Sequence, residues 1–441
     1  MRWTELAQEQ RRDLDYKIQV AVDVLGQAFQ VAQRPCLAFS GGKDSTALLD
    51  LVRRFYPDRL PGLSIVYGNT GMEFPECIRF VQWLAREWRL DLHVARPGRT
   101  DAPGFRYAAQ RRIWERLIRD GSIQSVLRPG GKLKSTAALE RACPADLRAE
   151  LESDRRMVWP AGTQMSYWWC VDQYGWPLLG KTWSRLDARR INVDTFLRFS
   201  QSESSDPKLL AYYNVLRQAK ISQHCCAALK KEPAARMQEA LGADLVFKGL
   251  MAAESRARSQ NFMTRGYLFE GAQRSYLAGR PFFHCQPLAV WTDADVWAYI
   301  ERYSVPYAPL YDLTYVAEDG SQQYVERNGC IGCGTDFGFR DNHLRVLRQT
   351  HRRAWLTLMR AGMAEQIRAL QQAMRTGGQW LTLFDTLTTD QLITVQPCAL
   401  DDLDGLGGKD TQGLVYDDQV DDPGDEGQEL LVAPQTVAVL A

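Results

Sequence analysis

The 441-residue chain lacks several features that would place it in a special class. No stretch approaches the roughly 20 consecutive apolar residues that a membrane-spanning helix needs. The charged N-terminal segment has no apolar core of a secretory signal. Ten cysteines are too few for a disulfide-stapled scaffold of this length, and no internal repeat is visible. We therefore expect a cytoplasmic protein without a membrane partner, and the sequence leaves its oligomeric state open.

The composition is that of an ordinary globular protein, with 45% hydrophobic and 24% charged residues. The net charge of +1 hides an asymmetry, because residues 400–441 hold eleven acidic side chains against one basic side chain, Lys409. Without that net charge of −10, the remaining chain carries +11. Such a basic body suits nucleotides or nucleic acid, although ordinary surface lysines and arginines would give the same balance.

Hydrophobic patterning predicts the secondary structure. Apolar residues recur at three- or four-residue intervals in the first 34 residues, which indicates one long amphipathic helix. Farther along, short apolar runs alternate with helical patterns. The expected strands are 36–39, 63–67, 90–95 and 244–249, and the expected helices are 45–55, 75–88, 292–303 and about 341–374. This alternation predicts an α/β fold with a parallel twisted sheet flanked by helices.

Four segments follow from these patterns. They are an N-terminal helix (1–34), a nucleotide-binding α/β domain (35–310), a helical C-terminal region with a C-x-x-C pair (311–399) and a flexible acidic tail (400–441). The nucleotide-binding domain contains an irregular stretch, about 100–215, that is rich in arginine and tryptophan. We interpret this stretch as an inserted lid.

The loop between the first expected strand and its helix reads SGGKDST, residues 40–46. Its glycines allow close backbone approach, the helix N-terminus offers unpaired N–H groups to an anion, and Lys43 adds a positive charge. Hydroxyl groups at 40, 45 and 46 add hydrogen-bond donors for phosphate. The spacing fits neither the G-x-x-x-x-G-K-[ST] phosphate loop nor the G-x-G-x-x-G dinucleotide turn. A glycine turn with incidental polar neighbours remains the alternative.

The S-G-G-K-D-S stretch after an apolar strand resembles the PP-loop of the ATP pyrophosphatases. This resemblance implies an adenine nucleotide alpha hydrolase-like fold that holds the pyrophosphate of ATP while the α-phosphate is attacked, with Mg²⁺ as the metal. The nucleotide-binding residues that it implies are Ser40, Gly41, Gly42, Lys43, Ser45 and Thr46, with Asn69, Thr70 and Glu73 beside the adenosine. The catalytic residues that it implies are Lys43, Asp44 and Ser45, since charge develops on the leaving pyrophosphate.

Two cysteine pairs lie far apart in the sequence. Cys225 and Cys226 are adjacent, and Cys330 and Cys333 form the C-x-x-C. Four thiolates are the usual ligand set of a [4Fe-4S] cluster, and zinc is the runner-up because four thiolates also make a closed zinc site. Four unrelated buried cysteines remain the plain alternative.

The order of CC, KKEP, GLMAAESRARS and C-x-x-C is similar to that of the sulfonucleotide reductases, the PAPS and APS reductase family. The resemblance implies that the four cysteines ligate a [4Fe-4S] cluster and that Arg256 and Arg258 bind substrate anions. It fails near the C-terminus, where these reductases carry a nucleophilic cysteine in E-C-G-L-H. Cys398 lacks those neighbours and precedes an acidic run, which disfavours a thiolate.

Because that cysteine is missing, we expect the PP-loop reaction instead of sulfate reduction. In this reaction ATP cleavage adenylates an acceptor, which is then passed to a sulfur donor. The layout resembles the ATP pyrophosphatase of bacterial DNA phosphorothioation and reductase-like proteins of phages, plasmids and CRISPR loci. Nucleic acid is therefore the expected acceptor, with Lys181 and Arg185 of the insertion as contacts. A cysteine desulfurase and defence-system proteins are the implied partners. A sulfonucleotide reductase and a non-catalytic binding accessory remain alternatives.

Two further helical segments carry functional or structural interpretations. Arg345, Arg348 and Arg352 are spaced to share one helical face, which suits either nucleic acid or solvent. The helix that follows Trp291 has Thr292 as its expected N-cap and is assigned to structure alone.

Overall fold

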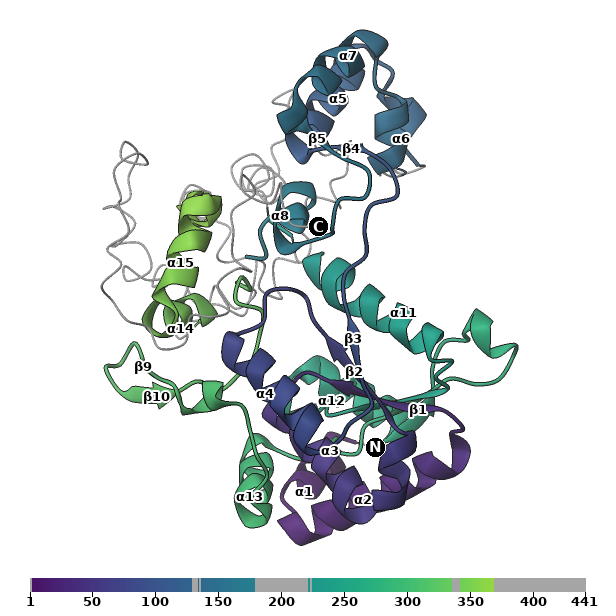
Figure 1. Cartoon of the computed structure of the whole chain (residues 1–441), viewed down its shortest axis with the longest axis vertical. Helices are drawn as coiled ribbons and strands as arrows, with labels where there is room; N and C mark the ends of the chain where they lie inside the picture. Colours follow the sequence, from purple (N-terminus) through teal and green to yellow (C-terminus); the bar gives the residue numbers. More distant parts are fainter. Residues whose placement is uncertain are drawn as a thin grey trace. The chain divides into compact units, whose positions relative to one another are not determined.

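The structure is a computed structural model that describes residues 2–128, 134, 136–178, 221–222, 224–334 and 342–368. The chain forms two compact units. Unit 1 contains residues 1–96, 230–313 and 324–329, and unit 2 contains the rest. In the described part of the chain, none of the helices is long and apolar enough to cross a membrane. Both units are drawn in Figure 1.

Unit 1 is built on a six-stranded sheet with the order β3-β2-β1-β6-β8-β7. The strands are β1 (Pro35–Phe39), β2 (Ser64–Gly68), β3 (Leu92–Ala95), β6 (Leu245–Lys248), β7 (Leu268–Glu270) and β8 (Phe283–Cys285). Five of them are parallel, and β7 is antiparallel to β8 at the edge. The expected parallel α/β sheet is confirmed, and the short strands β7 and β8 add to it.

Helices cover both faces of this sheet (Figure 1). On one face, Phe29 of a helix packs on Phe247 of β6, with their ring centroids 5.0 Å apart. On the other face, Met237 and Leu241 pack against the buried Cys36 and Val246. The helices of unit 1 are α1 (Trp3–Gln10), α2 (Leu14–Val31), α3 (Lys43–Phe55), α4 (Pro75–Glu87), α11 (Glu232–Ala240), α12 (Arg256–Arg265) and α13 (Asp293–Tyr303). Its short 3₁₀ turns are η1 (Pro57–Gly62), η7 (Ala252–Glu254), η8 (Ser275–Leu277) and η9 (Pro309–Asp312).

The N-terminal segment differs from the single helix that the sequence predicts. It forms two helices, α1 and α2, with a break between Gln10 and Leu14. Asp13 caps α2, because its side chain accepts a hydrogen bond from the backbone N–H of Tyr16 at 2.8 Å. A capping aspartate adopts an extended backbone, and this ends the helical run before it and starts a new one.

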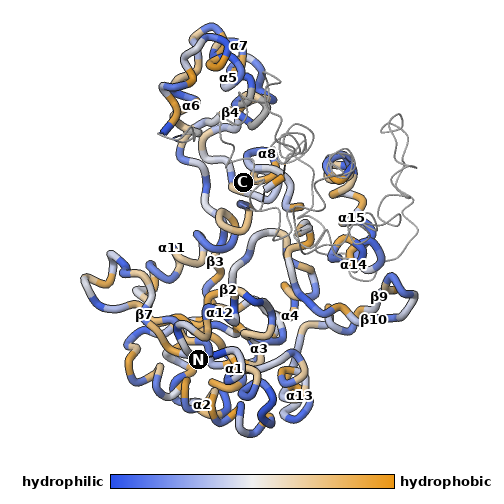
Figure 2. Tube along the Cα trace, turned by 180° about the vertical axis from the view of Figure 1, so that it is seen from behind, coloured by the Kyte–Doolittle hydropathy of each residue, from blue (hydrophilic) through white to orange (hydrophobic). Residues whose placement is uncertain are grey.

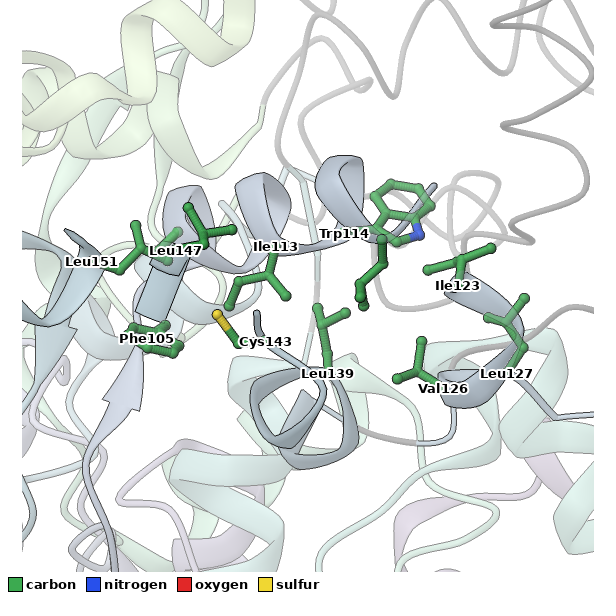
Figure 3. Close-up of a cluster of buried hydrophobic side chains, with 12 residues drawn as sticks. Phe105, Ile113, Trp114, Ile123, Val126, Leu127, Leu139, Cys143, Leu147 and Leu151 are labelled. Atoms are coloured by element: carbon green, nitrogen blue, oxygen red, sulfur yellow. The ribbon is translucent and has the colours of Figure 1, made fainter. Parts of the chain in front are cut away.

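The inserted stretch gives unit 2 a core of its own. It contains β4 (Gly104–Phe105), α5 (Tyr107–Arg119), η2 (Ile123–Val126), α6 (Thr136–Arg141), α7 (Ala145–Ser153), η3 (Arg155–Met157), β5 (Val158–Trp159) and α8 (Tyr167–Gln173). Figure 3 shows the side chains of Ile113, Leu139 and Leu147 converging from three of these helices. Hydrophilic and hydrophobic stretches alternate along the same helices in Figure 2, as expected for amphipathic helices that cover a small core.

The C-terminal part of unit 2 replaces one expected helix by separate pieces. It forms α14 (His343–Thr350), α15 (Arg352–Leu358) and the π-turn η10 (Met359–Met363). Two earlier elements, the π-turn η6 (Ala227–Lys231) and the strand β10 (Gln322–Tyr324), begin in unit 2 and end in residues of unit 1, and β10 pairs with β9 (Thr314–Val316). Arg345 and Arg348 lie on α14, whereas Arg352 begins α15. The guanidinium of Arg348 stacks over Trp355 at 5.8 Å. The three arginines therefore do not share one helical face, because the helix breaks at His351.

Candidate functional site

The glycine loop lies where β1 ends and α3 begins, at the carboxyl edge of the parallel strands (Figure 1). Ligands of open α/β sheets bind at this edge. Gly41 has a φ of +70°, and a Cβ there would lie 2.6 Å from Cγ2 of Val81. Gly42 takes the N-cap position of α3 without a capping side chain. The loop therefore needs glycine at 41 both for its backbone conformation and for the close approach of α4.

The hydroxyl groups of the loop hold its own backbone. The Oγ atoms of Ser40 and Ser45 are 3.1 Å apart, and the N–H of Gly42 donates to Ser40 Oγ at 3.2 Å. Ser45 and Thr46 both donate to the carbonyl oxygen of Gly42 at 3.0 Å. These bonds fix the loop in a defined shape before any ligand binds.

Lys43 is buried and lies between two carboxylates. Its Nζ is 2.6 Å from Oδ1 of Asp293 and 3.2 Å from Oδ1 of Asp44. Its backbone N–H donates to the hydroxyl of Tyr311 at 3.2 Å, and its ammonium lies 5.7 Å from the centre of that ring. Burial raises the pKa of Tyr311, so its hydroxyl stays protonated. The ammonium is thus held at the start of α3, and its contact with a phosphate stays a prediction.

Asp44 carries an unfavourable charge in this setting. Burial raises the pKa of its carboxyl group, and Asp293 adds to the rise. The positive charges of Lys43 and Arg258 lower the pKa but do not cancel the burial. A carboxylate in this position gains from a nearby cation, which is consistent with a metal-orienting role.

A residue from far along the chain closes the loop from another side. The side-chain amide of Asn328 donates to the carbonyl oxygen of Ser40 at 3.0 Å. A Cβ on Gly42 would lie 2.5 Å from Oδ1 of Asn328. Gly42 is therefore required by this contact, since its φ of −82° is open to any residue.

The turn after β2 is held by its own side chains. Glu73 accepts hydrogen bonds from the backbone N–H and the hydroxyl of Thr70, at 2.9 and 2.7 Å. Asn69 accepts from the N–H of Gly71 at 2.9 Å. The side chains of Asn69, Thr70 and Glu73 thus stabilise the turn at the carboxyl edge of the sheet, and a contact with adenosine stays a prediction.

The two predicted substrate arginines lie in different surroundings. Arg256 is exposed at the first position of α12, whereas Arg258 is partly buried and pairs with Glu254. The pKa of Arg258 is lowered by burial and by the positive charge of Arg327, while Asp44 raises it. Arg258 therefore lies close enough to the guanidinium of Arg327 and to the carboxylate of Asp44 for both charges to shift its pKa.

The four predicted metal-ligating cysteines all belong to unit 2, and none of the four is in a disulfide bond. Tyr167 of α8 is buried beside them. Its pKa is raised well above the ordinary value by burial and by the nearby Cys225, Cys333, Cys330 and Cys170. Its hydroxyl donates to the carbonyl oxygen of Gly332 at 2.8 Å, within the C-x-x-C turn. The structure thus brings both cysteine pairs to one tyrosine and adds a fifth thiol, Cys170.

The chemistry of this donor set fits a thiolate-ligated metal, because cluster iron and zinc both accept four thiolates. The described side chains, however, are not arranged as a metal-ligand set. Among the described residues, no three His, Cys, Asp or Glu side chains are placed to hold a metal ion. The metal role of the four cysteines accordingly stays a prediction. Lys181, Arg185 and Cys398 lie outside the described residues.

Much of the chain matches a known protein family. Residues 34–130 and 185–333 match the family described as phosphoadenosine phosphosulfate reductase domain. These ranges cover more than half of the chain and include the glycine loop and both cysteine pairs. The chain belongs to this family. The predicted relationship to PAPS reductase-like proteins is therefore confirmed.

Curated members of the family and related proteins match parts of the chain. A 61-residue segment is 46% identical to sulfate adenylyltransferase subunit 2 of Rhizobium etli, and it covers 14% of this chain and 19% of that protein. Phosphoadenosine 5'-phosphosulfate reductase of Xylella fastidiosa is 23% identical over 64% of this chain and 69% of its own. The match thus covers only about a fifth of the length of the sulfate adenylyltransferase relatives. A crystal structure of PAPS reductase from Candida auris aligns with a TM-score of 0.32 and 15% identity, over 72% of this chain and 96% of that one.

Sequence reasoning missed four residues of this site: Asp293, Tyr311, Arg327 and Asn328. The helix that begins at Asp293 was assigned to structure alone, yet its first residue pairs with Lys43. Arg327 and Asn328 lie just before the C-x-x-C pair, and in the sequence only the cysteines of this segment indicate a site. Their positions were readable in the sequence, but nothing in their spacing linked them to the loop.

Proposed function

We propose that the chain binds ATP at residues 40–46 and cleaves it at the α-phosphate. An acceptor oxygen attacks the α-phosphorus and pyrophosphate leaves, and a sulfur nucleophile then displaces AMP from the adenylated acceptor. The observation that carries this proposal is the glycine loop with a buried ammonium at the start of α3. Its backbone is preorganised by Ser40, Ser45 and Thr46. Fixed donors of this kind stabilise charge on a leaving group without reorganisation.

The roles of the individual side chains follow from their positions. Lys43 stabilises the charge that develops on the leaving pyrophosphate, and the loop N–H groups hold its oxygens. Asp44 is the carboxylate that would hold Mg²⁺, and Asp293 lies on the other side of the same ammonium. A bound Mg²⁺ supplies Lewis-acid stabilisation of the phosphate oxygens. Arg258 and Arg327 supply positive charge for the acceptor, and Arg256 stays a candidate at the same helix start.

The acceptor that we propose is nucleic acid. The net charge of +11 outside the acidic tail supports a polyanionic partner. The name of the sulfate adenylyltransferase relatives supports transfer of an adenylyl group within this family. We further propose a cysteine desulfurase as the sulfur donor, a role in a phosphorothioation or CRISPR defence system, and cluster ligation by Cys225, Cys226, Cys330 and Cys333 with zinc as the alternative.

Product analysis with α-labelled ATP and Mg²⁺, with and without DNA or RNA, tests the proposal. We expect labelled AMP and pyrophosphate, stimulation by the nucleic acid, and loss of both products in Lys43→Ala. Lys134→Ala, an exposed lysine of unit 2, is the matched control. ADP with orthophosphate as products would overturn the proposal.

The family match favours a second candidate, a sulfonucleotide reductase. It predicts sulfite release from adenylyl sulfate or its 3'-phosphate with a thioredoxin-type donor, and no dependence on ATP. Nucleotide binding without any turnover would instead indicate an accessory protein that binds nucleotide and nucleic acid.

A further inference from the structure

A second group of nitrogen donors lies on the sheet of unit 1. It consists of Lys248 on β6, His284 on β8 and Arg274 in the segment between β7 and β8. His284 is the register partner of Val246, and Lys248 follows Val246 by two positions. Since side chains alternate along a strand, Lys248 and His284 project from the same face. These three residues are called the cationic cluster below.

Two atoms of the cationic cluster are buried without a partner. Within the described ranges, neither Nε of Arg274 nor Nδ1 of His284 has a hydrogen-bond partner. A buried donor that is left unsatisfied costs about 1–3 kcal/mol, more when it is charged. Such atoms are rare in folded proteins and call for an explanation, a bound ion being one.

The surrounding residues hold these atoms in place. The guanidinium of Arg274 stacks over Phe282 at 4.8 Å, and the ring of His284 lies 5.1 Å from the same phenyl ring. Phe269 packs on the imidazole at 5.2 Å. On the other edge of the imidazole, a Cβ on Gly271 would lie only 2.5 Å from Nε2. The ring of His284 is therefore held between Phe269, Phe282 and Gly271, and its Nδ1 has no hydrogen-bond partner among the described residues.

Positive charges predominate around the cluster. Burial lowers the pKa of His284 to about 4, and the positive charges of Lys248, Arg274 and Arg265 contribute. The pKa of Lys248 is likewise lowered by burial and by Arg274, while Cys36 acts in the opposite direction. Burial raises the pKa of the Cys36 thiol to about 12, so this thiol stays neutral near pH 7. No carboxylate lies within 4.0 Å of Lys248, Arg274 or His284 in the part of unit 1 that the structure describes. An anion would supply the missing negative charge.

We propose that Lys248, Arg274 and His284 bind a tetrahedral oxyanion, phosphate or sulfate. A tetrahedral oxyanion accepts from the N–H groups of a guanidinium and an imidazole at once, and an ammonium adds charge as a compact donor. The site does not depend on ATP chemistry at residues 40–46. It would remain if the proposed function failed.

The test uses the full chain with ¹³C-labelled histidine, in which His284 is one of five histidines and is assigned with His284→Asn. The signal is followed against pH at constant ionic strength with phosphate, sulfate or chloride. We expect phosphate or sulfate to raise the titration midpoint of His284, because an anion favours the protonated ring. Chloride should leave it near its anion-free position.

Arg274→Gln should raise the dissociation constant of the anion about tenfold, as read from the concentration that gives half of the shift in the His284 midpoint. This is the effect of losing one charge-assisted hydrogen bond of roughly 1.4 kcal/mol. Arg280→Gln is the matched control, because Arg280 lies in the same segment, is exposed and bonds to Gln33. The response should persist in Lys43→Ala, which separates this site from the glycine loop. A response to phosphate alone or to sulfate alone identifies the ligand. Equal responses to chloride and phosphate, or a wild-type response in Arg274→Gln, would overturn the proposal. Thermal unfolding confirms that each variant is folded.

Discussion

The ammonium of Lys43 lies 2.6 Å from a carboxylate oxygen of Asp293, on a helix 250 residues farther along the chain. Lys43 is almost wholly buried, whereas the side chain of Asp293 is 59% exposed. The charge that should meet a phosphate is therefore already neutralised from the solvent side. A phosphate ligand must either displace this carboxylate or share the ammonium with it.

We predict that Asp293→Asn binds ATP more tightly than the wild type. The substitution keeps the shape and removes the competing negative charge. An ion pair with one exposed partner is worth up to about 1 kcal/mol, so the gain in affinity should reach about fivefold. Titration calorimetry without Mg²⁺ measures it. The matched control is Glu301→Gln, an exposed carboxylate on the same helix, which should leave the affinity unchanged. Weaker binding in Asp293→Asn would show that Asp293 supports the ligand.

A double-substitution cycle tests the contact between Gly42 and Asn328. We predict that Gly42→Ala weakens ATP binding, because its Cβ would lie 2.5 Å from Oδ1 of Asn328 and push the loop. In Gly42→Ala/Asn328→Ala that obstacle is absent, so part of the affinity should return. Residues in contact typically show coupling energies of about 0.5–3 kcal/mol.

The matched control for this cycle is Gly41→Ala. Gly41 has a φ of +70° and faces Val81, so the cost of its Cβ does not involve Asn328. Adding Asn328→Ala to Gly41→Ala should restore nothing. Strictly additive effects in the Gly42 cycle would contradict the proposed positioning role of Asn328.

The sheet and the loop were predictable because their signals are local. Residues 36–39 form an apolar run, and the two glycines with a lysine follow at once, so one short window contains the strand, the turn and the helix start. The three-residue strands β7 and β8 escaped prediction, since so short a segment shows no periodicity. The helix break at Asp13 depends on one capping side chain within a continuous apolar pattern.

The rest of the site could not be predicted because it is made by tertiary contact. Tyr311 reaches the backbone of Lys43 across 268 residues, and Asn328 reaches Ser40 across 288. No periodicity connects positions so far apart. The sequence groups the two cysteine pairs only because four thiolates form a common ligand set. The structure brings both pairs near Tyr167, but their side chains are not arranged to hold a metal ion.

Stability should depend on pH through Asp44. Its pKa is raised from 3.8 in the folded state by burial, so the folded state binds its proton more tightly than the unfolded state. The charged carboxylate therefore costs stability above the folded pKa, and the cost vanishes below about pH 3.8, where both states are protonated. We predict that Asp44→Asn raises Tm at pH 7 and that the gain shrinks as the pH falls. Scanning calorimetry measures this trend. Asp58→Asn, at an exposed position, should show no such trend. A gain that grows toward low pH would contradict the burial argument.

Metal content decides the role of the cysteines near Tyr167. All four predicted ligands are partly buried and outside disulfide bonds. The backbone N–H of Cys333 donates to the carbonyl oxygen of Cys330 at 2.9 Å in a tight turn. Protein purified without oxygen should be brown and contain iron and sulfide, and Cys330→Ala should lose both, because a [4Fe-4S] cluster needs its fourth thiolate. Cys285→Ala is the matched control, since Cys285 is buried in β8 of unit 1 and burial raises the pKa of its thiol. It should retain the metal.

Zinc without colour would assign the same residues to a structural zinc site. A wild-type chain without iron or zinc would leave the thiols as packing around Tyr167 and remove all four from the ligand set.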